Sequence, residues 1–350
     1  MKKQQNYQKI LKILTIFIFV LFIFKGYSQT ANIITGKSAH FELKYNNDTI
    51  NFIVLNRDLN VKKPIFLYCQ GEDPIPLFLD YDDKGIFMYA GGCVNFDYKK
   101  IAEQYHIIVI SKPKIPLISE TTETFVNDFE LKEYFNKNYE NNQFLANESL
   151  ENNTNRALFV LKFLSTQKWA DLQNLVIVGY SQGAEVATNI AVKEKLVKKL
   201  VLLNPCPFGK IIQLVIQLRR DAEDKKISWE EADKKIQKLY ERYILSIDNE
   251  VIRATPEIVS FGSFSSNLFE MWSKLNIPIF LGYGTSDPTT ELCEMSPLFF
   301  IKANKTNLTL KRYFYLGHNF CQLDDERKED ISTMKWKEVM SDVYNWLQQN

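Results

Sequence analysis

Residues 175–183, Leu-Val-Ile-Val-Gly-Tyr-Ser-Gln-Gly, constrain the fold of this chain more than any other stretch. The four apolar residues at the start predict a short buried strand, and the pattern Gly-x-Ser-x-Gly follows directly. Apolar residues at helical spacing over residues 184–192 predict a helix behind it. A strand, a sharp turn and a helix with Ser181 at the apex make up the arrangement known as a nucleophile elbow.

Crowding at the apex explains the two glycines of this pattern. Strained backbone geometry at Ser181 requires small residues two positions away on each side, and Gly179 and Gly183 meet that requirement. Such a turn lifts the Ser181 hydroxyl clear of the sheet. It also directs the backbone N–H of Gln182 and the positive end of the helix toward the same place. Ordinary turns contain the bare pattern too, so the prediction depends on the strand and helix around it.

Length and charge limit the class of protein. The chain has 350 residues and a formal net charge of +1, which suits one large α/β domain or a domain with an insertion. Because there is no basic excess and no basic stripe, the sequence gives no indication of nucleic-acid binding.

The N-terminus has the pattern of a secretory signal peptide. Several lysines precede an apolar run over residues 13–24, and Gly26 and Ser28 stand in the small-residue arrangement of a cleavage site. The run is shorter than the roughly 20 residues that span a membrane. We therefore expect residues 1–28 to be removed on export to the periplasm or beyond, leaving residues 29–350 with no stable membrane span. An uncleaved membrane anchor is the alternative.

The cysteines do not form a metal-binding pattern. The chain has five, none in a Cys-x-x-Cys spacing, so a zinc site is not expected. Export would permit disulfides. A bridge between Cys293 and Cys321 is conceivable, and single buried thiols fit the sequence at least as well.

Strand patterns alternate with helical patterns along most of the chain. Strands are expected at residues 38–45, 49–56, 65–69, 106–110, 175–178, 199–203, 278–281 and 308–315, and helices at 96–104, 155–166, 184–192, 228–245 and 336–347. The first two strands form a hairpin, and Asn95 is the expected N-cap of the first helix. The alternation predicts an α/β fold with a doubly wound, mostly parallel sheet.

Three segments depart from this alternation. Residues 77–92 are expected to form a surface excursion, with Asp80, Asp82 and Asp83 at a charged hairpin tip. A cation site there is a weaker alternative. Residues 113–145 are not assigned to elements.

Residues 208–274 contain no obvious strand, and a capping box at residues 228–231 begins a long helix there. We expect this insertion to form a helical cap over the carboxyl edge of the sheet, although helices that simply pack on the sheet are the alternative. Its aromatic residues suggest an apolar pocket lining, which core packing explains equally well; they are Trp229, Tyr240, Tyr243, Phe261, Phe264 and Trp272.

One histidine stands where a base for Ser181 is needed. A serine nucleophile requires a base with a pKa near neutral, and histidine is the usual choice. The chain has three histidines. His40 lies in the first hairpin, and His106 lies at the amino end of a strand, the wrong edge of the sheet. His318 follows a strand, and Asp287 follows the preceding strand, so the order is the Ser…Asp…His expected for this architecture.

These residues define the roles of a catalytic triad. Ser181 would attack a carbonyl carbon, His318 would carry the proton, and Asp287 would orient the imidazole. A glycine directly after the strand at 65–69 lets backbone N–H groups turn inward. The oxyanion hole is therefore expected to use the backbone N–H of Gln182 together with that of Glu72 or Gly71.

From about residue 38 to the end, the sequence resembles the α/β-hydrolase superfamily. Residues 179–183, Asp287 and His318 match the nucleophile, acid and histidine positions of that family. Gln70-Gly71 resembles its oxyanion loop, with glutamine in place of the more usual histidine, and the insertion falls where the family places its cap. The resemblance implies an esterase, lipase, thioesterase or peptidase without deciding among them.

The sequence thus predicts an exported serine hydrolase that cleaves a carboxylic ester. A peptidase or acyltransferase with the same triad is one alternative, and a catalytically silent binding protein with this fold is another. The triad generates its own nucleophile, so no cofactor and no metal are expected. The expected partner is a small-molecule or acyl substrate, and the oligomeric state stays open.

Overall fold

The computed structural model describes residues 32–34, 38–55, 58–81, 84–121, 125, 128–139 and 142–349. The predicted signal peptide, residues 1–28, lies outside the described residues. Within the described ranges, no helix has both the length and the apolar character needed to cross a membrane.

A nine-stranded sheet organises the fold, in the order β1-β2-β3-β7-β4-β9-β10-β11-β12. Its strands are β1 (Asn32–Ile34), β2 (Ser38–Tyr45), β3 (Asp48–Val54), β4 (Lys63–Cys69), β7 (His106–Ile110), β9 (Ala170–Tyr180), β10 (Val197–Leu203), β11 (Ile279–Gly284) and β12 (Leu308–Tyr313). β2 and β3 form an antiparallel hairpin, β3 pairs antiparallel with β7, and every pair from β7 to β12 is parallel. The prediction of a mostly parallel sheet with an N-terminal hairpin is confirmed.

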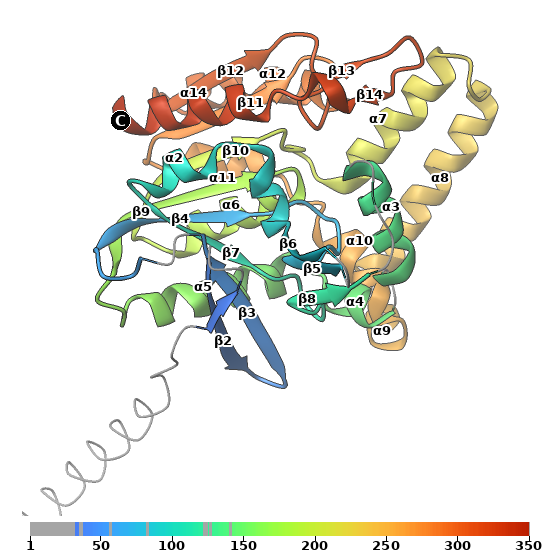
Figure 1. Ribbon diagram of the computed structural model, residues 1–350. Helices are drawn as coiled ribbons and strands as arrows, with labels where there is room; N and C mark the ends of the chain where they lie inside the picture. The colour runs from blue at the N-terminus through green and yellow to red at the C-terminus, as the bar shows by residue number, and fades with distance from the viewer. Residues whose placement is uncertain are drawn as a thin grey trace, which may run out of the picture. The chain divides into compact units, whose positions relative to one another are not determined.

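Helices cover both faces of this sheet, which explains why its central strands read as continuous apolar runs. On one side lie α2 (Tyr98–Ala102) and α14 (Trp336–Gln349), whose apolar residues pack against Val176, Val178 and Val201 (Figure 1). On the other side α6 (Gln182–Lys193) packs against β9 and β10, with α5 (Leu150–Leu164) and α11 (Leu268–Lys274) beside it.

The segment between β10 and β11 is entirely helical. It contains α7 (Lys210–Glu223), α8 (Trp229–Ser246), α9 (Asn249–Ala254), η2 (Pro256–Ile258), α10 (Val259–Ser263) and α11. α7 and α8 pack side by side, in yellow in Figure 1. The Ser228 hydroxyl accepts a hydrogen bond from the backbone N–H of Glu231 at 3.1 Å, as the capping box predicts.

Residues 77–97 correct two predictions. They contain β5 (Phe78–Tyr81) and β6 (Gly85–Met88), which join β8 (Ile118–Glu120) in a second sheet, and η1 (Ala90–Asn95). Phe78 and Leu79 of β5 are buried in the core, whereas residues 85–87 of β6 are exposed, so the predicted surface excursion is correct for the second strand of this hairpin and wrong for the first. Asn95 ends η1, and the residue before α2 is Asp97, so Asn95 is not that helix's N-cap. Asp82 and Asp83 of the predicted hairpin tip lie outside the described residues.

The remaining elements complete the chain. α3 (Asp128–Tyr139) and α4 (Asn142–Asn147) fill the unassigned region, α12 (Thr290–Glu294) and α13 (Ser296–Lys302) follow β11, and β13 (Gln322–Leu323), β14 (Glu329–Asp330) and η3 (Ile331–Thr333) precede α14. Cys293 and Cys321 are both buried thiols that no disulfide joins. His106 is buried away from the site, where Nε2 bonds the Val61 carbonyl at 2.9 Å.

Candidate active site

Ser181 occupies a strained turn between β9 and α6. Its φ of 53° lies in the left-handed region, which residues with a side chain rarely adopt. Its backbone N–H donates to the Leu203 carbonyl at 2.9 Å, which ties the turn to the neighbouring strand. A Cβ on Gly179 would lie 2.3 Å from the Gly183 carbonyl oxygen, and one on Gly183 would lie 2.0 Å from the Cys69 carbonyl oxygen. The prediction that both flanking positions must be small is confirmed.

Ser181, His318 and Asp287 lie in one chain of hydrogen bonds. His318 Nε2 is 2.8 Å from Ser181 Oγ, and His318 Nδ1 is 2.5 Å from Asp287 Oδ2. Asp287 follows β11 and His318 follows β12, so the carboxyl ends of adjacent parallel strands bring both loops to the same edge as Ser181. The structure therefore places together the three residues that the sequence singled out.

Thr289 holds the Asp287 carboxylate from the side away from His318. Its backbone N–H and its hydroxyl both donate to Asp287 Oδ1 at 2.7 Å. Burial acts to raise the pKa of Asp287, but the charge and hydrogen bond of His318 and the bonds from Thr289 outweigh it, so that pKa falls below its ordinary value. Asp287 is therefore ionised at neutral pH. The pattern Asp-x-Thr in a turn could have indicated this contact.

His318 is shaped by opposing influences. Burial acts to lower the pKa of its imidazole, whereas the charge and hydrogen bond of Asp287 raise it, and the net pKa lies above the ordinary 6.5. Its backbone carbonyl accepts hydrogen bonds from Asn204 Nδ2 at 2.6 Å and from the Tyr180 hydroxyl at 3.3 Å. Sequence reasoning missed Asn204, which follows β10 with no motif to mark it.

The three residues expected to supply oxyanion donors surround Ser181. Gln182 begins α6, where backbone N–H groups lack intrahelical acceptors. Its side-chain oxygen accepts from the buried Lys112 at 3.0 Å. Gly71 is close enough that a Cβ there would lie 3.9 Å from Ser181 Cβ. Glu72 lines a cleft together with Ser181 and His318, and its carboxylate pairs with Lys210 at 2.7 Å.

Comparison with known proteins supports a fold and nothing finer. No protein-family model and no curated protein sequence matches the chain. A solved structure from Bacteroides ovatus, named as a candidate dipeptidyl aminopeptidase IV, is 12% identical with a TM-score of 0.51. The match covers 93% of this chain and 37% of that one.

The chain has the α/β-hydrolase fold.

Two further solved structures of this fold resemble the chain more weakly. Acylaminoacyl peptidase from Pyrococcus horikoshii has 12% identity, a TM-score of 0.49 and coverage of 88% of this chain and 41% of that one. Naproxen esterase from Bacillus subtilis has 11% identity and a TM-score of 0.45, and the match covers 88% of this chain and 91% of that one. The fold assignment therefore depends on the Bacteroides ovatus structure and on the sheet topology.

In this α/β-hydrolase fold, the cleft beside Ser181 is narrow. Its volume is about 10 Å³, close to that of a single water molecule. Lys210 and Gln213 of α7 contribute to one wall, and Phe264 is the one residue that reaches it among the six aromatic residues that the sequence analysis named. Trp272 is fully buried and donates its indole N–H to Thr188, while Trp229 is 48% exposed, so the cleft lacks the aromatic lining that the sequence suggested.

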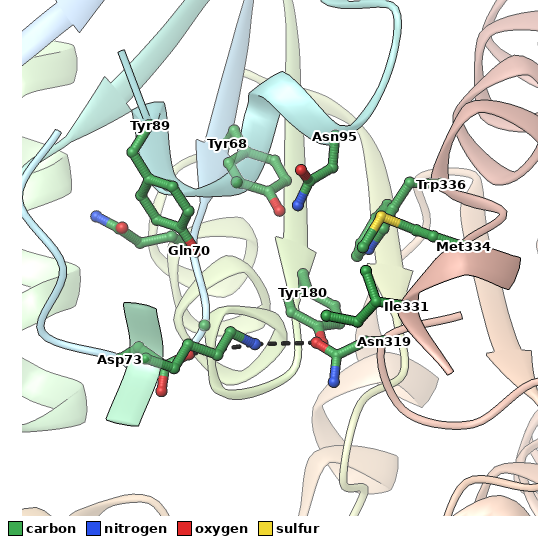
Figure 2. Close-up of a pocket in the computed structure, with 14 residues that line it drawn as sticks. Tyr68, Gln70, Asp73, Tyr89, Asn95, Tyr180, Asn319, Ile331, Met334 and Trp336 are labelled. Carbon is green, nitrogen blue, oxygen red and sulfur yellow. Dashed lines mark hydrogen bonds and ion pairs between the residues drawn. The ribbon is translucent and has the colours of Figure 1, made fainter. Parts of the chain in front are cut away.

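A second cavity of about 40 Å³ lies against Tyr180 and Gly71, the residues adjoining Ser181 and Glu72 in the chain (Figure 2). The Tyr180 hydroxyl donates to Asn319 Oδ1 at 2.8 Å, and Lys132 donates to the same oxygen at 3.0 Å. A third cavity, of about 170 Å³, has His318 in its wall, together with Arg220 of α7. The described residues contain no group of three or more histidine, cysteine or acidic side chains arranged to hold a metal ion.

Proposed function

We propose that the chain is a serine hydrolase that cleaves a carboxylic ester through an acyl-enzyme. One observation carries the proposal: the unbroken chain of hydrogen bonds from Ser181 through His318 to the buried, ionised Asp287. A base in contact with the nucleophile and an acid that orients the base are the elements of serine activation. The names of the similar solved structures, which include both peptidases and an esterase, are compatible with this class.

Each residue has a role in the proposed reaction. Ser181 Oγ attacks the substrate carbonyl carbon while His318 Nε2 takes its proton. The tetrahedral oxyanion is held by the N–H of Gln182 and by that of Gly71 or Glu72. His318 then gives the proton to the leaving group, and the acyl-enzyme forms. Water, deprotonated by His318, attacks the acyl carbonyl, and collapse of the second intermediate releases the acid and restores Ser181.

Two finer statements also belong to the proposal. The helices from α7 to α11 act as a cap, because α7 contributes Lys210 and Gln213 to the cleft and none of this segment enters the central sheet. Export is supported by the sequence pattern of residues 1–28 alone.

The test is covalent labelling with a fluorophosphonate probe. We expect the purified protein to be labelled, Ser181→Ala to lose labelling entirely and His318→Ala to lose it by at least about a hundredfold, because the serine is no longer activated. Ser165→Ala, at an exposed serine that follows α5, is the matched control and should label like the parent. A folded parent that fails to label would refute the hydrolase and favour a silent binding protein.

A substrate screen on the labelled protein then separates the reaction classes. We expect short-chain aryl esters to be hydrolysed with a kcat/KM at least about tenfold above that for matched anilides. The reverse order would favour a peptidase. Preferential transfer of the acyl group to an added alcohol over water would favour an acyltransferase.

A further inference from the structure

Glu185 is a buried carboxyl in the wall of the cleft that contains Ser181 and His318. It lies on α6, and its exposed fraction is 3%. The backbone N–H of Ser266 donates a hydrogen bond to this carboxyl. Its Oε2 atom has no hydrogen-bond partner within the described part of the chain. A buried carboxyl oxygen without a partner costs free energy, and a ligand bound in the cleft can supply the missing partner.

The surrounding charges do not supply that partner. Lys210 is the nearest cation, but its ammonium group pairs with the Glu72 carboxylate at 2.7 Å. Lys112, the other cation beside Ser181, is committed to Glu148 and to the Gln182 side chain. Burial raises the pKa of Glu185 to about 8, the direction expected of a carboxyl without a close counter-ion, and a donor bound at Oε2 would favour the ionised form.

We infer that Glu185 is a specificity-determining residue that binds a hydrogen-bond donor, a hydroxyl or an amino group, on the acyl part of the substrate. The inference rests on the proposed hydrolase function. The leaving group must face His318, which gives it a proton, so a group held from α6 belongs to the acyl part. Ser181 is the N-cap residue of α6 and Glu185 lies in the first turn of that helix, so we expect the donor near the start of the acyl chain, on its second or third carbon.

Three matched esters test this assignment. They are the 4-nitrophenyl esters of butyrate, 3-hydroxybutyrate and 3-aminobutyrate, which share a leaving group and a chain length. We expect the parent to prefer both donor-bearing esters over butyrate by about 10- to 100-fold in kcat/KM, because only these complete the Oε2 hydrogen bond. The hydroxyl and amino arms distinguish the two sources of the donor.

Two substitutions assign the preference to Glu185. Glu185→Met removes the carboxyl at similar volume and should bring both ratios to within about twofold of one. Glu185→Gln keeps an acceptor oxygen and should retain most of the hydroxyl preference while losing the preference for the ammonium form of the amino ester. Glu270→Gln, at an exposed glutamate on α11, should leave both ratios as in the parent.

The outcomes are separable from those of the proposed function. A labelled, active parent with no preference for either donor-bearing ester overturns the inference and leaves the hydrolase intact. So does a Glu185→Met or Glu185→Gln variant that slows all three esters by one common factor, which is the mark of a structural role. An unlabelled, inactive parent refutes the hydrolase itself.

Discussion

Gly183 shows how little freedom the residues around Ser181 have. A Cβ at this position would overlap the Cys69 carbonyl oxygen at the end of β4, an atom of the backbone that cannot rotate away. The same crowding applies to Gly179 against the first turn of α6. Because close backbone contacts require glycine at both positions, the Gly-x-Ser-x-Gly pattern was sufficient, with its flanking strand and helix, to predict the elbow.

Gly183→Ala is expected to lower the free energy of unfolding by at least about 3 kcal/mol, because β4 and α6 must separate to admit the methyl group. Thermal and denaturant unfolding of the purified variant measure it. Gly71→Ala is the matched control, since its Cβ would meet neighbours only at 3.6 Å or more. Equal stability of the two variants would contradict the prediction.

Asp287→Asn is expected to change both the rate and its pH dependence. His318 accepts the Ser181 proton only when neutral, so kcat/KM in the parent should rise with pH through a midpoint above 6.5. Without the carboxylate, only the charge of Glu329 still opposes the effect of burial, so the midpoint should move downward, while kcat falls by about 10⁴-fold. The profile is measured from pH 5 to 9, with the exposed Asp325→Asn as control. An unchanged or higher midpoint would count against the assigned role.

At the scale of elements, the parallel strands and their flanking helices follow from the sequence because buried strands need continuous apolar runs and amphipathic helices need a 3.6-residue period. The second sheet, formed by β5, β6 and β8, could not be predicted from the sequence. Its strands β5 and β8 have only 4 and 3 residues, and they pair with partners 40 positions apart in the chain. α3 and α4 were equally hidden, in a polar, asparagine-rich region without a clear stripe.

The contact between Lys112, after β7, and Glu148, before α5, gives an element-scale prediction. The two side chains are 4% and 2% exposed, and they form an ion pair at 2.5 Å. The Lys112 ammonium also donates a hydrogen bond to the side chain of Gln182, the first residue of α6. Lys112→Met should therefore lower the free energy of unfolding by about 3–5 kcal/mol, because Glu148 is left buried without a counter-ion. Denaturant unfolding measures it, and the double variant Lys112→Met with Glu148→Gln should recover part of the loss. A single variant within about 0.5 kcal/mol of the parent would show that the pair is unimportant.

At the scale of the whole molecule, the three triad residues are easier to predict than the residues that surround them. Ser181, Asp287 and His318 each stand at the end of a recognisable strand, so chain order and sheet edge were sufficient to group them. Asn204 and Glu185 reach the site only in the assembled fold, whereas the contact of Thr289 with Asp287 is local and was missed although the sequence contains its pattern. The sequence also does not show that most aromatic side chains between β10 and β11 lie away from the cleft, because their positions depend on how the helices pack.

The thiols report on the integrity of the whole fold. Burial raises the pKa of Cys206 to about 12 and holds the pKa values of Cys93 and Cys293 well above their ordinary value, so few thiolates form at these three buried positions at pH 8. We expect these thiols to react with Ellman's reagent at least about a hundredfold more slowly in the native protein than in guanidinium chloride. The rise in reactivity should coincide with the loss of circular dichroism. Rapid reaction of the native protein would contradict the buried placement.

The volume of the cleft beside Ser181 has a kinetic consequence. The cleft measures only about 10 Å³, and α7 forms one wall of it, with Lys210 paired to Glu72 and Arg220 paired to Glu291. We expect α7 to shift when an acyl chain enters this cleft. The rate of labelling by a probe with a long acyl chain should then increase hyperbolically with probe concentration and level off at the rate at which this helix moves.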